Sequence, residues 1–259
     1  MQHNILLTPG PTMIPEEVYG ALARPIIHHR TPQFQQYIKE VIEGLQYVFQ
    51  TNNEIYLLAS SGTGAMEAAV CNLLSPGDAC LTVEGGKFGE RWRELAQAFG
   101  AKPCVMEVEW GKVVDPQKIK DTLELNPEIK AVFITQTETS TAALTDVKAV
   151  ADVVKARDAV LVVDCVSGLG ANDLKTDEWG VDVVVSASHK GFMLPPGLAY
   201  ISVSDKAYAL IENSSNHRYY FDLRKSKKTF AKTDTPFTPA INIVIGLVES
   251  LRIIKKAGL

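Results

Sequence analysis

Short runs of apolar, often β-branched residues alternate with amphipathic stretches along most of the chain, and this alternation limits the fold more than any other feature. Several runs are nearly continuous in apolar residues, as expected for strands that are covered on both faces. Strands that alternate with helices favour an α/β domain. We therefore predict an α/β fold with a mainly parallel seven-stranded sheet flanked by helices. The predicted strands are Ile55–Ala59, Ala79–Val83, Cys104–Val108, Ala131–Thr135, Val160–Asp164, Asp182–Ser186 and Leu198–Val203.

Helical patterns lie between these strands and near both ends of the sequence. The segment Thr8–Thr12, which contains two prolines and a glycine, predicts a stretch rich in turns. Ligands of parallel sheets bind beyond the carboxyl ends of the strands, so the residues that follow each strand are the first candidates for a site. The predicted helices are Pro32–Gln50, Gly64–Leu74, Glu90–Phe99, Pro116–Leu125, Asp146–Ala156 and Pro239–Lys256.

Composition and charge are those of an ordinary soluble globular protein. The chain has 259 residues, of which 46% are hydrophobic and 22% charged, and its net charge is −4 without a long basic run; these values disfavour a nucleic-acid partner. A small basic cluster is interpreted as a solvated loop. No apolar run is long enough to span a bilayer, and the N-terminus lacks a secretory signal pattern, so we expect a cytoplasmic protein. The basic cluster consists of Arg224, Lys225, Lys227 and Lys228.

The cysteines predict neither disulfides nor a metal site. They form no CxxC pair and lie in or beside apolar stretches, so we expect buried free thiols, which suits a reducing cytosol. No cluster of His, Cys and Asp has the spacing of metal ligands. The four cysteines are Cys71, Cys80, Cys104 and Cys165.

Lys190 is the first candidate for chemistry. It follows an apolar strand and lies in a segment rich in glycine and proline, Ser186–Gly197. Burial lowers the pKa of an ammonium group, so a lysine in this position is a candidate amine nucleophile that can form a Schiff base. An arbitrary lysine past a strand end is more often a surface residue, so the interpretation depends on other residues.

Other segments that follow strands supply further chemistry. Ser60–Glu67 opens a helix with small residues, which suits a phosphate group but also an ordinary strand-to-helix turn. Phe88, in the segment Gly86–Arg91, is a platform for a flat ring or a core residue. The hydroxyl-rich run Thr135–Thr141 either binds a ring hydroxyl or is a polar loop.

Asp164 ends an apolar strand, and a buried carboxylate needs a partner. That partner is a helix amide, a metal ion or a protonated ring nitrogen, and no ligand cluster supports the metal. An anion cradle, a ring platform, an acid and an amine are together the parts that pyridoxal phosphate requires.

With these residues in this order, the chain resembles the class V, fold-type I pyridoxal-phosphate aminotransferases, especially the alanine–glyoxylate and serine–glyoxylate (serine–pyruvate) group. The likeness extends from Thr8-Pro9-Gly10-Pro11 to the segment Thr235–Pro239. It implies an N-terminal arm over residues 1–20 at the mouth of the substrate site and a cofactor-binding large domain over residues 21–259 that ends in the inter-domain helix. It also implies that a small C-terminal domain, with the arginine that binds the substrate carboxylate, is absent. For such a truncated chain or natural fragment, we expect cofactor binding to survive better than turnover.

The resemblance implies a role for each candidate residue and a homodimer with shared active sites. Lys190 would form the internal aldimine and shuttle the proton, and Asp164 would pair with the pyridine nitrogen. His28, His29 and Arg30 would lie near the dimer interface, in a structural or a catalytic role. The resemblance assigns phosphate binding to Ser61, Gly62, Thr63 and His189, the last at a position where relatives usually carry Gln. Phe88 and Val166 would stack on the cofactor ring, and Thr139 would contact the ring hydroxyl. Thr235 would bind the partner subunit's phosphate, and Gly10 would lie near the substrate carboxylate.

The function expected from the resemblance is transfer of an amino group from alanine or serine to glyoxylate or pyruvate. A cysteine desulfurase or related lyase and a cofactor-binding fragment without turnover are the alternatives. A nicotinamide oxidoreductase is disfavoured, because the glycine-rich turn lacks the GxGxxG spacing. Donor selectivity depends on pocket shape, so the sequence leaves the donor and the acceptor open.

Overall fold

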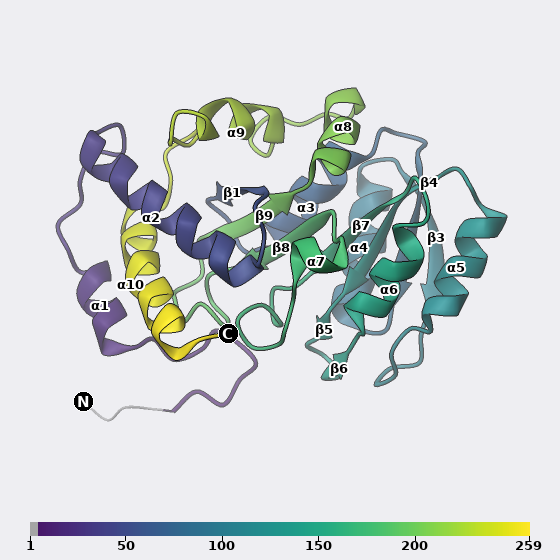
Figure 1. The fold of residues 1–259 in the computed structure, drawn as a ribbon, viewed down its shortest axis with the longest axis horizontal. Coiled ribbons are helices and arrows are strands. Elements are labelled where there is room, and N and C mark those ends of the chain that lie inside the picture. The colour runs from purple at the N-terminus through teal and green to yellow at the C-terminus, as the bar shows by residue number, and fades with distance from the viewer. Residues whose placement is uncertain (1–4) are drawn as a thin grey trace.

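One seven-stranded sheet forms the centre of the protein, in the order β1-β9-β8-β7-β4-β2-β3. The computed structural model describes residues 5–259 (Figure 1). Strand β9 is antiparallel to both of its neighbours, β1 and β8, and the other pairs in this sheet are parallel. The predicted mainly parallel seven-stranded sheet is confirmed, with strand ends shifted by at most two residues. The strands are β1 Glu54–Leu58, β2 Ala79–Glu84, β3 Lys102–Glu107, β4 Ile129–Thr135, β7 Val160–Asp164, β8 Val183–Ala187 and β9 Ala199–Val203.

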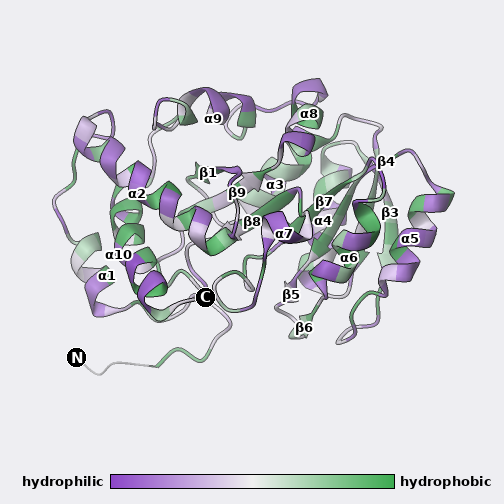
Figure 2. Cartoon of the chain, in the orientation of Figure 1, coloured by the Kyte–Doolittle hydropathy of each residue, from purple (hydrophilic) through white to green (hydrophobic). Residues whose placement is uncertain are grey.

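Helices cover both faces of the sheet, which explains why its strands are apolar at successive positions. Leu161 and Val163 pack into one core, with α2, α5, α6 and α10, whereas Val160 and Val162 pack into the other, with α3, α4, α8 and α9. Figure 2 shows largely hydrophobic strands, in green, and helices that carry both hydrophilic (purple) and hydrophobic (green) residues. The helices are α1 Glu16–Leu22, α2 Pro32–Phe49, α3 Gly62–Leu73, α4 Lys87–Ala98, α5 Pro116–Leu125, α6 Val147–Val154, α7 Thr176–Trp179, α8 Asp205–Asn213, α9 Leu223–Phe230 and α10 Ile241–Ala257.

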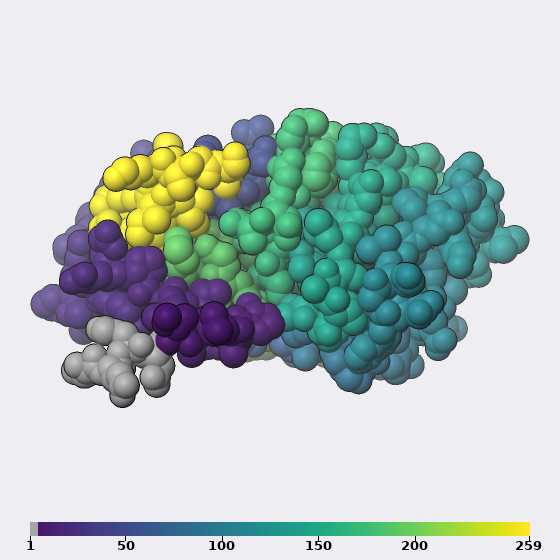
Figure 3. All heavy atoms as spheres, turned by 90° about the horizontal axis from the view of Figure 1, so that it is seen from below, coloured from purple at the N-terminus to yellow at the C-terminus, as the bar shows by residue number. Residues whose placement is uncertain are grey.

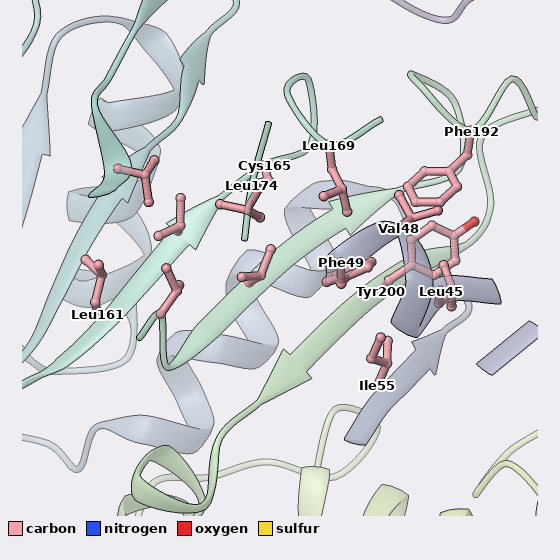
Figure 4. Close-up of a cluster of buried hydrophobic side chains, with 14 of the residues drawn as sticks. Leu45, Val48, Phe49, Ile55, Leu161, Cys165, Leu169, Leu174, Phe192 and Tyr200 are labelled. Atoms are coloured by element: carbon pink, nitrogen blue, oxygen red, sulfur yellow. The ribbon is translucent and has the colours of Figure 1, made fainter. Parts of the chain in front are cut away.

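The first core joins the sheet to helix α2. Figure 4 shows Phe49 and Leu45 of this helix beside Ile55 of β1 and Tyr200 of β9. The ring of Tyr200 meets that of Phe192 edge to face, with 4.9 Å between the centroids. Full burial of one such large side chain stabilises the fold by about 1.5–3 kcal/mol. The segment after β8 that contains Lys190 is therefore anchored two residues later, at Phe192.

Helix α9 corrects one prediction. The basic cluster from Arg224 to Lys228 was expected in a solvated loop, and it lies in this helix instead. Asp222 caps the helix by accepting from the backbone amide of Arg224, Leu223 packs into the core, and Lys227 lies over the ring of Tyr208 at 3.6 Å. The segment has only two apolar residues, Leu223 and Phe230, so its run of charged and polar residues was interpreted as a loop.

The cysteines behave largely as expected. All are free thiols; Cys71, Cys80 and Cys165 are buried, and Cys104 is half-buried. None of the helices within residues 5–259 is long and apolar enough to cross a membrane.

The segment that precedes α1 lies across the edge of the sheet. Figure 3 shows these dark purple residues against the green and teal middle of the chain. Thr12 anchors the segment, because its amide donates to the carbonyl of His189 at 3.2 Å and its hydroxyl donates to the carbonyl of Lys190 at 2.9 Å. The first four residues of the arm predicted over 1–20 lie outside the described residues, and the division into arm and large domain stays a prediction.

Candidate active site

The parallel strands deliver the predicted site residues to one edge of the sheet. Ser61 follows β1, Phe88 follows β2, Asp164 is the last residue of β7, and Lys190 comes three residues after β8. Thr139 follows β5 (Thr137–Glu138), which pairs with β6 (Ala143–Leu144) just beyond β4. This small two-stranded sheet was not predicted, because strands of two residues are too short to show an alternating pattern.

Lys190 is held beneath the N-terminal segment. Its side chain is only 8% exposed, and its Nζ donates to the carbonyl oxygen of Pro9 at 3.1 Å. A Cβ added to Gly10 would lie 2.4 Å from Cδ of Lys190, so the backbone here passes closer to the lysine than a side chain allows. Burial lowers the pKa of Lys190, and the negative charge of Asp164 partly opposes this effect.

Asp164 is a buried carboxylate without a cationic partner. It is 3% exposed, and its Oδ1 accepts from the amide of Val166 at 2.8 Å. No salt bridge to it is found within residues 5–259. Burial raises its pKa to about 6, and the charges of Arg91 and Lys190 hold it down only in part. The environment therefore favours a cation, or a proton, at this carboxylate.

The N-terminus of α3 lies at the same edge. Ser61 is the N-cap residue, and its side chain accepts no hydrogen bond from the first turn. The first amides of a helix without such a cap are free to bind an anion. A Cβ added to Gly62 would lie 2.6 Å from Cγ2 of Val166, so this turn packs directly against the residue that follows Asp164 by two positions. Thr63 accepts from Nη1 of Arg91 at 3.1 Å.

His189 and Thr139 are also at this edge. Nδ1 of His189 is buried and has no partner within the described chain, and burial, followed by the charge of Lys190, lowers the pKa of this imidazole. The hydroxyls of Thr139 and Ser167 share a hydrogen bond of 2.5 Å. Ser167 was not a predicted site residue, and nothing in its local sequence indicates this contact.

Two charged residues near the site were also missed as site residues. The guanidinium of Arg91 lies 4.8 Å above the ring of Phe88, and the carboxylate of Glu138 accepts from the amide of Phe88 at 3.1 Å. Both lie in segments that sequence analysis selected for other residues. Arg91 contacts Thr63 across 28 residues of sequence, and Glu138 contacts Phe88 across 50. No local sequence pattern therefore indicates either contact.

Thr235 lies elsewhere in the chain. It is buried, its hydroxyl donates to the carbonyl of Phe237 at 2.8 Å, and it lines a cavity of about 300 Å³ between α2, β1 and the segment after α9. Arg30 forms an ion pair with the neighbouring Asp234. The rings of His28 and His29, just before Arg30, stack with centroids 4.9 Å apart. The structure thus joins the segment 28–30 to the segment around Thr235, but not to Lys190.

The chain is similar to known proteins over nearly its whole length. Over 258 residues the chain is 45% identical to a protein of Anabaena cylindrica named soluble hydrogenase 42 kDa subunit, a match that covers 98% of this chain and 67% of that protein. It is 38% identical to the serine–glyoxylate aminotransferase of Methylorubrum extorquens, covering 99% of this chain and 66% of that enzyme. The crystal structure of alanine–glyoxylate aminotransferase from a Nostoc species superposes with a TM-score of 0.95 at 30% identity, over 100% of this chain and 70% of that one.

The chain therefore spans about two thirds of the length of these relatives. A model of the family "Aminotransferase class-V" matches residues 9–259, which is nearly the whole chain. The match includes every strand of the sheet and every site residue described above. The chain belongs to the class-V aminotransferases, a family of transaminases that use pyridoxal phosphate.

Proposed function

We propose that this chain binds pyridoxal phosphate at the carboxyl edge of its sheet and carries the cofactor half of an aminotransferase active site. The observation that carries the proposal is the pair of Asp164 and Lys190. A buried acid that lacks a cation lies near a buried amine, and a pyridinium ring with an aldehyde group complements both.

Four further features fit the phosphate and the ring. The uncapped amides at the start of α3 suit a phosphate dianion, and the buried Nδ1 of His189 offers a donor or acceptor that has no partner within residues 5–259. Val166 packs on Gly62 beneath this turn, where its side chain offers an apolar face to a flat ring. Phe88, from the other side of the site, supplies an aromatic surface.

The residues divide the chemical work as follows. Pyridoxal phosphate, when bound, supplies an electron sink for a substrate that has lost its α-proton. Lys190, whose lowered pKa favours the neutral amine, takes up that proton at Nζ and returns it one position along the substrate. The carboxylate of Asp164 holds the proton on the ring nitrogen, where the positive charge maintains the sink.

For the substrates we propose alanine or serine as amino donor and glyoxylate or pyruvate as acceptor. The Methylorubrum and Nostoc relatives, named serine–glyoxylate and alanine–glyoxylate aminotransferase, support this choice. The backbone of Gly10 passes against the side chain of Lys190, where a Cβ at position 10 would lie 2.4 Å from Cδ, and we assign this backbone to the substrate carboxylate.

We also propose a homodimer with shared sites. Tyr219 is 73% exposed and packs with Tyr220 around Phe237, two residues after Thr235. Exposed aromatic residues of this kind are typical of interfaces. In the dimer, the hydroxyl of Thr235 exchanges the carbonyl of Phe237 for the phosphate in the partner subunit's site, and Arg30 holds the segment through Asp234. Light scattering coupled to gel filtration tests this proposal; a monomer at micromolar concentration contradicts it.

Visible absorbance and borohydride reduction test the cofactor proposal. The wild-type chain is expected to gain a visible absorbance band with pyridoxal phosphate, and borohydride is expected to fix the cofactor to Lys190, as mass spectrometry of peptides shows. Lys190→Ala is expected to lose both signals, with Lys120→Ala, an exposed lysine of α5, as the matched control. A wild-type chain with no Lys190-linked adduct contradicts the proposal.

Single-turnover reactions with alanine, serine and aspartate then test the donor. Conversion of bound cofactor to its amine form by alanine or serine, and return by glyoxylate or pyruvate, supports the transaminase. Cofactor binding without conversion by any donor favours a cofactor-binding fragment.

A further inference from the structure

Phe88 is fixed in place by a carboxylate from another segment. Oε2 of Glu138 accepts from the amides of Phe88 at 3.1 Å and Gly89 at 3.0 Å. Oε1 of the same side chain accepts from the amide of Ser140 at 3.1 Å and from its hydroxyl at 2.6 Å. Glu138 is 5% exposed, so these four donors take the place of water around a buried carboxylate.

Ser140 extends this arrangement to the first amide of α4. Its hydroxyl accepts from the amide of Lys87 at 3.1 Å, so the first three amides of the helix find partners in the segment of β5. The N-cap residue itself, Gly86, has no side chain with which to cap the helix. A Cβ at Gly86 would lie 2.4 Å from Oγ of Ser140 and 2.5 Å from Cδ of Glu138, so the two segments fit closely only with glycine here.

Arg91 fixes the ring of Phe88 from one face. Its guanidinium lies 4.8 Å above the ring and donates to Thr63 at 3.1 Å. Arg91 forms no salt bridge within residues 5–259, unlike Arg93 two residues later, which pairs with Glu84. A cation over an aromatic face, tied at its other end to the start of α3, restricts both the tilt and the position of the ring. Arg91 thereby connects the ring platform to the residues proposed for the phosphate.

We propose that Glu138 and Arg91 are positioning residues that hold Phe88 as the platform for the cofactor ring. Glu138 sets the backbone of Phe88, and Arg91 sets its ring, which leaves the opposite face of that ring for the cofactor. Neither residue touches the cofactor itself. The inference rests on the proposed function, because it names what orients one wall of the same site.

A double-mutant cycle tests this inference. The single variants are Glu138→Gln, Arg91→Met and Phe88→Ala. Two double variants combine Phe88→Ala with Glu138→Gln or with Arg91→Met. The control is Glu94→Gln, which changes an exposed carboxylate of α4. The measurements are the dissociation constant for pyridoxal phosphate, the visible circular dichroism of the bound cofactor and the melting temperature. Each single variant is expected to weaken binding by about fivefold to tenfold, which is the loss of one aromatic contact. In the Phe88→Ala background, Glu138→Gln is expected to have no further effect on binding, and Arg91→Met is expected to keep only the smaller effect of losing its bond to Thr63. Glu94→Gln changes nothing in either background.

The outcomes separate this inference from the proposed function. Effects of Glu138→Gln or Arg91→Met that add in full to that of Phe88→Ala overturn the inference, because residues that act through Phe88 cannot act in its absence. Unchanged circular dichroism in both single variants overturns it as well. A wild-type chain without Lys190-dependent binding overturns the proposed function and the positioning role together. If Glu138→Gln does not fold, Ser140→Ala weakens the same connection more mildly and is expected to show the same dependence on Phe88.

Discussion

The buried carboxylate of Asp164 is expected to make the cofactor-free chain less stable as the pH rises. Its pKa is raised in the folded state from an ordinary value of 3.8 to about 6. Between these two values the folded state binds more protons than the unfolded state, so the free energy of unfolding falls as the pH rises. Each tenfold change in proton affinity corresponds to about 1.4 kcal/mol, and the whole loss amounts to about 3 kcal/mol above pH 6.

Asp164→Asn removes this loss. The amide oxygen still accepts from Val166, as the carboxylate does, but it carries no charge to bury. The variant is expected to match the wild type near pH 4 and to exceed it by up to about 3 kcal/mol at pH 7.5. Urea denaturation at several pH values measures the difference, with the fluorescence of tryptophan as the signal, since Trp92 is fully buried. Asp121→Asn, an exposed carboxylate in α5, is the control.

Addition of pyridoxal phosphate is expected to reverse the order. A ring cation beside Asp164 lowers the pKa of the carboxylate and recovers the lost stability, so the wild type gains more from the cofactor than the variant does. A difference between the two proteins that stays constant from pH 4 to 7.5 refutes the reasoning about burial. An equal gain from the cofactor refutes the pairing of Asp164 with the ring nitrogen.

Three substitutions test the packing around the site. Gly62→Ala, whose Cβ would lie 2.6 Å from Val166, is expected to destabilise the fold by about 1–3 kcal/mol in urea denaturation and to weaken cofactor binding; unchanged binding contradicts the phosphate role. Gly89→Ala places its Cβ 2.6 Å from the carbonyl oxygen of Val83, in backbone that cannot move aside, so its melting temperature is expected below that of Gly62→Ala. Arg218→Met breaks a pair with Asp222 in which the arginine side chain is 1% exposed, and is expected to destabilise by about 3 kcal/mol without changing cofactor affinity once folded; a change in affinity contradicts a purely structural role.

The sequence predicts the sheet well, because its strands lie between helices on both faces. Val160–Asp164 is apolar up to its final carboxylate, and that pattern locates both the strand and the candidate acid. Helix α5 is also predicted at its true ends, since Asp115 caps it and Pro116 begins it. Helix α9 escapes prediction because only Leu223 and Phe230 in it are apolar, and its contact between Lys227 and Tyr208 joins separate segments.

The candidate site is predictable only in part. Asp164, the last residue of β7, and Lys190, which follows β8, are found by their position, because parallel strands end at a common edge. Glu138 and Arg91 are found only from the structure. Their partners lie in other segments, and a carboxylate or guanidinium in a polar loop has no sequence pattern that distinguishes it from a solvated side chain.

The contact between Thr12 and Lys190 joins positions separated by 178 residues. During synthesis the N-terminal segment emerges first, yet its place on the molecule does not exist until β8 and the lysine that follows it have been made. The earliest part of the chain is thus among the last to dock, and contacts of this sequence separation form slowly. Until this segment docks, Lys190 lacks the cover that Pro9 and Gly10 give it in the folded protein.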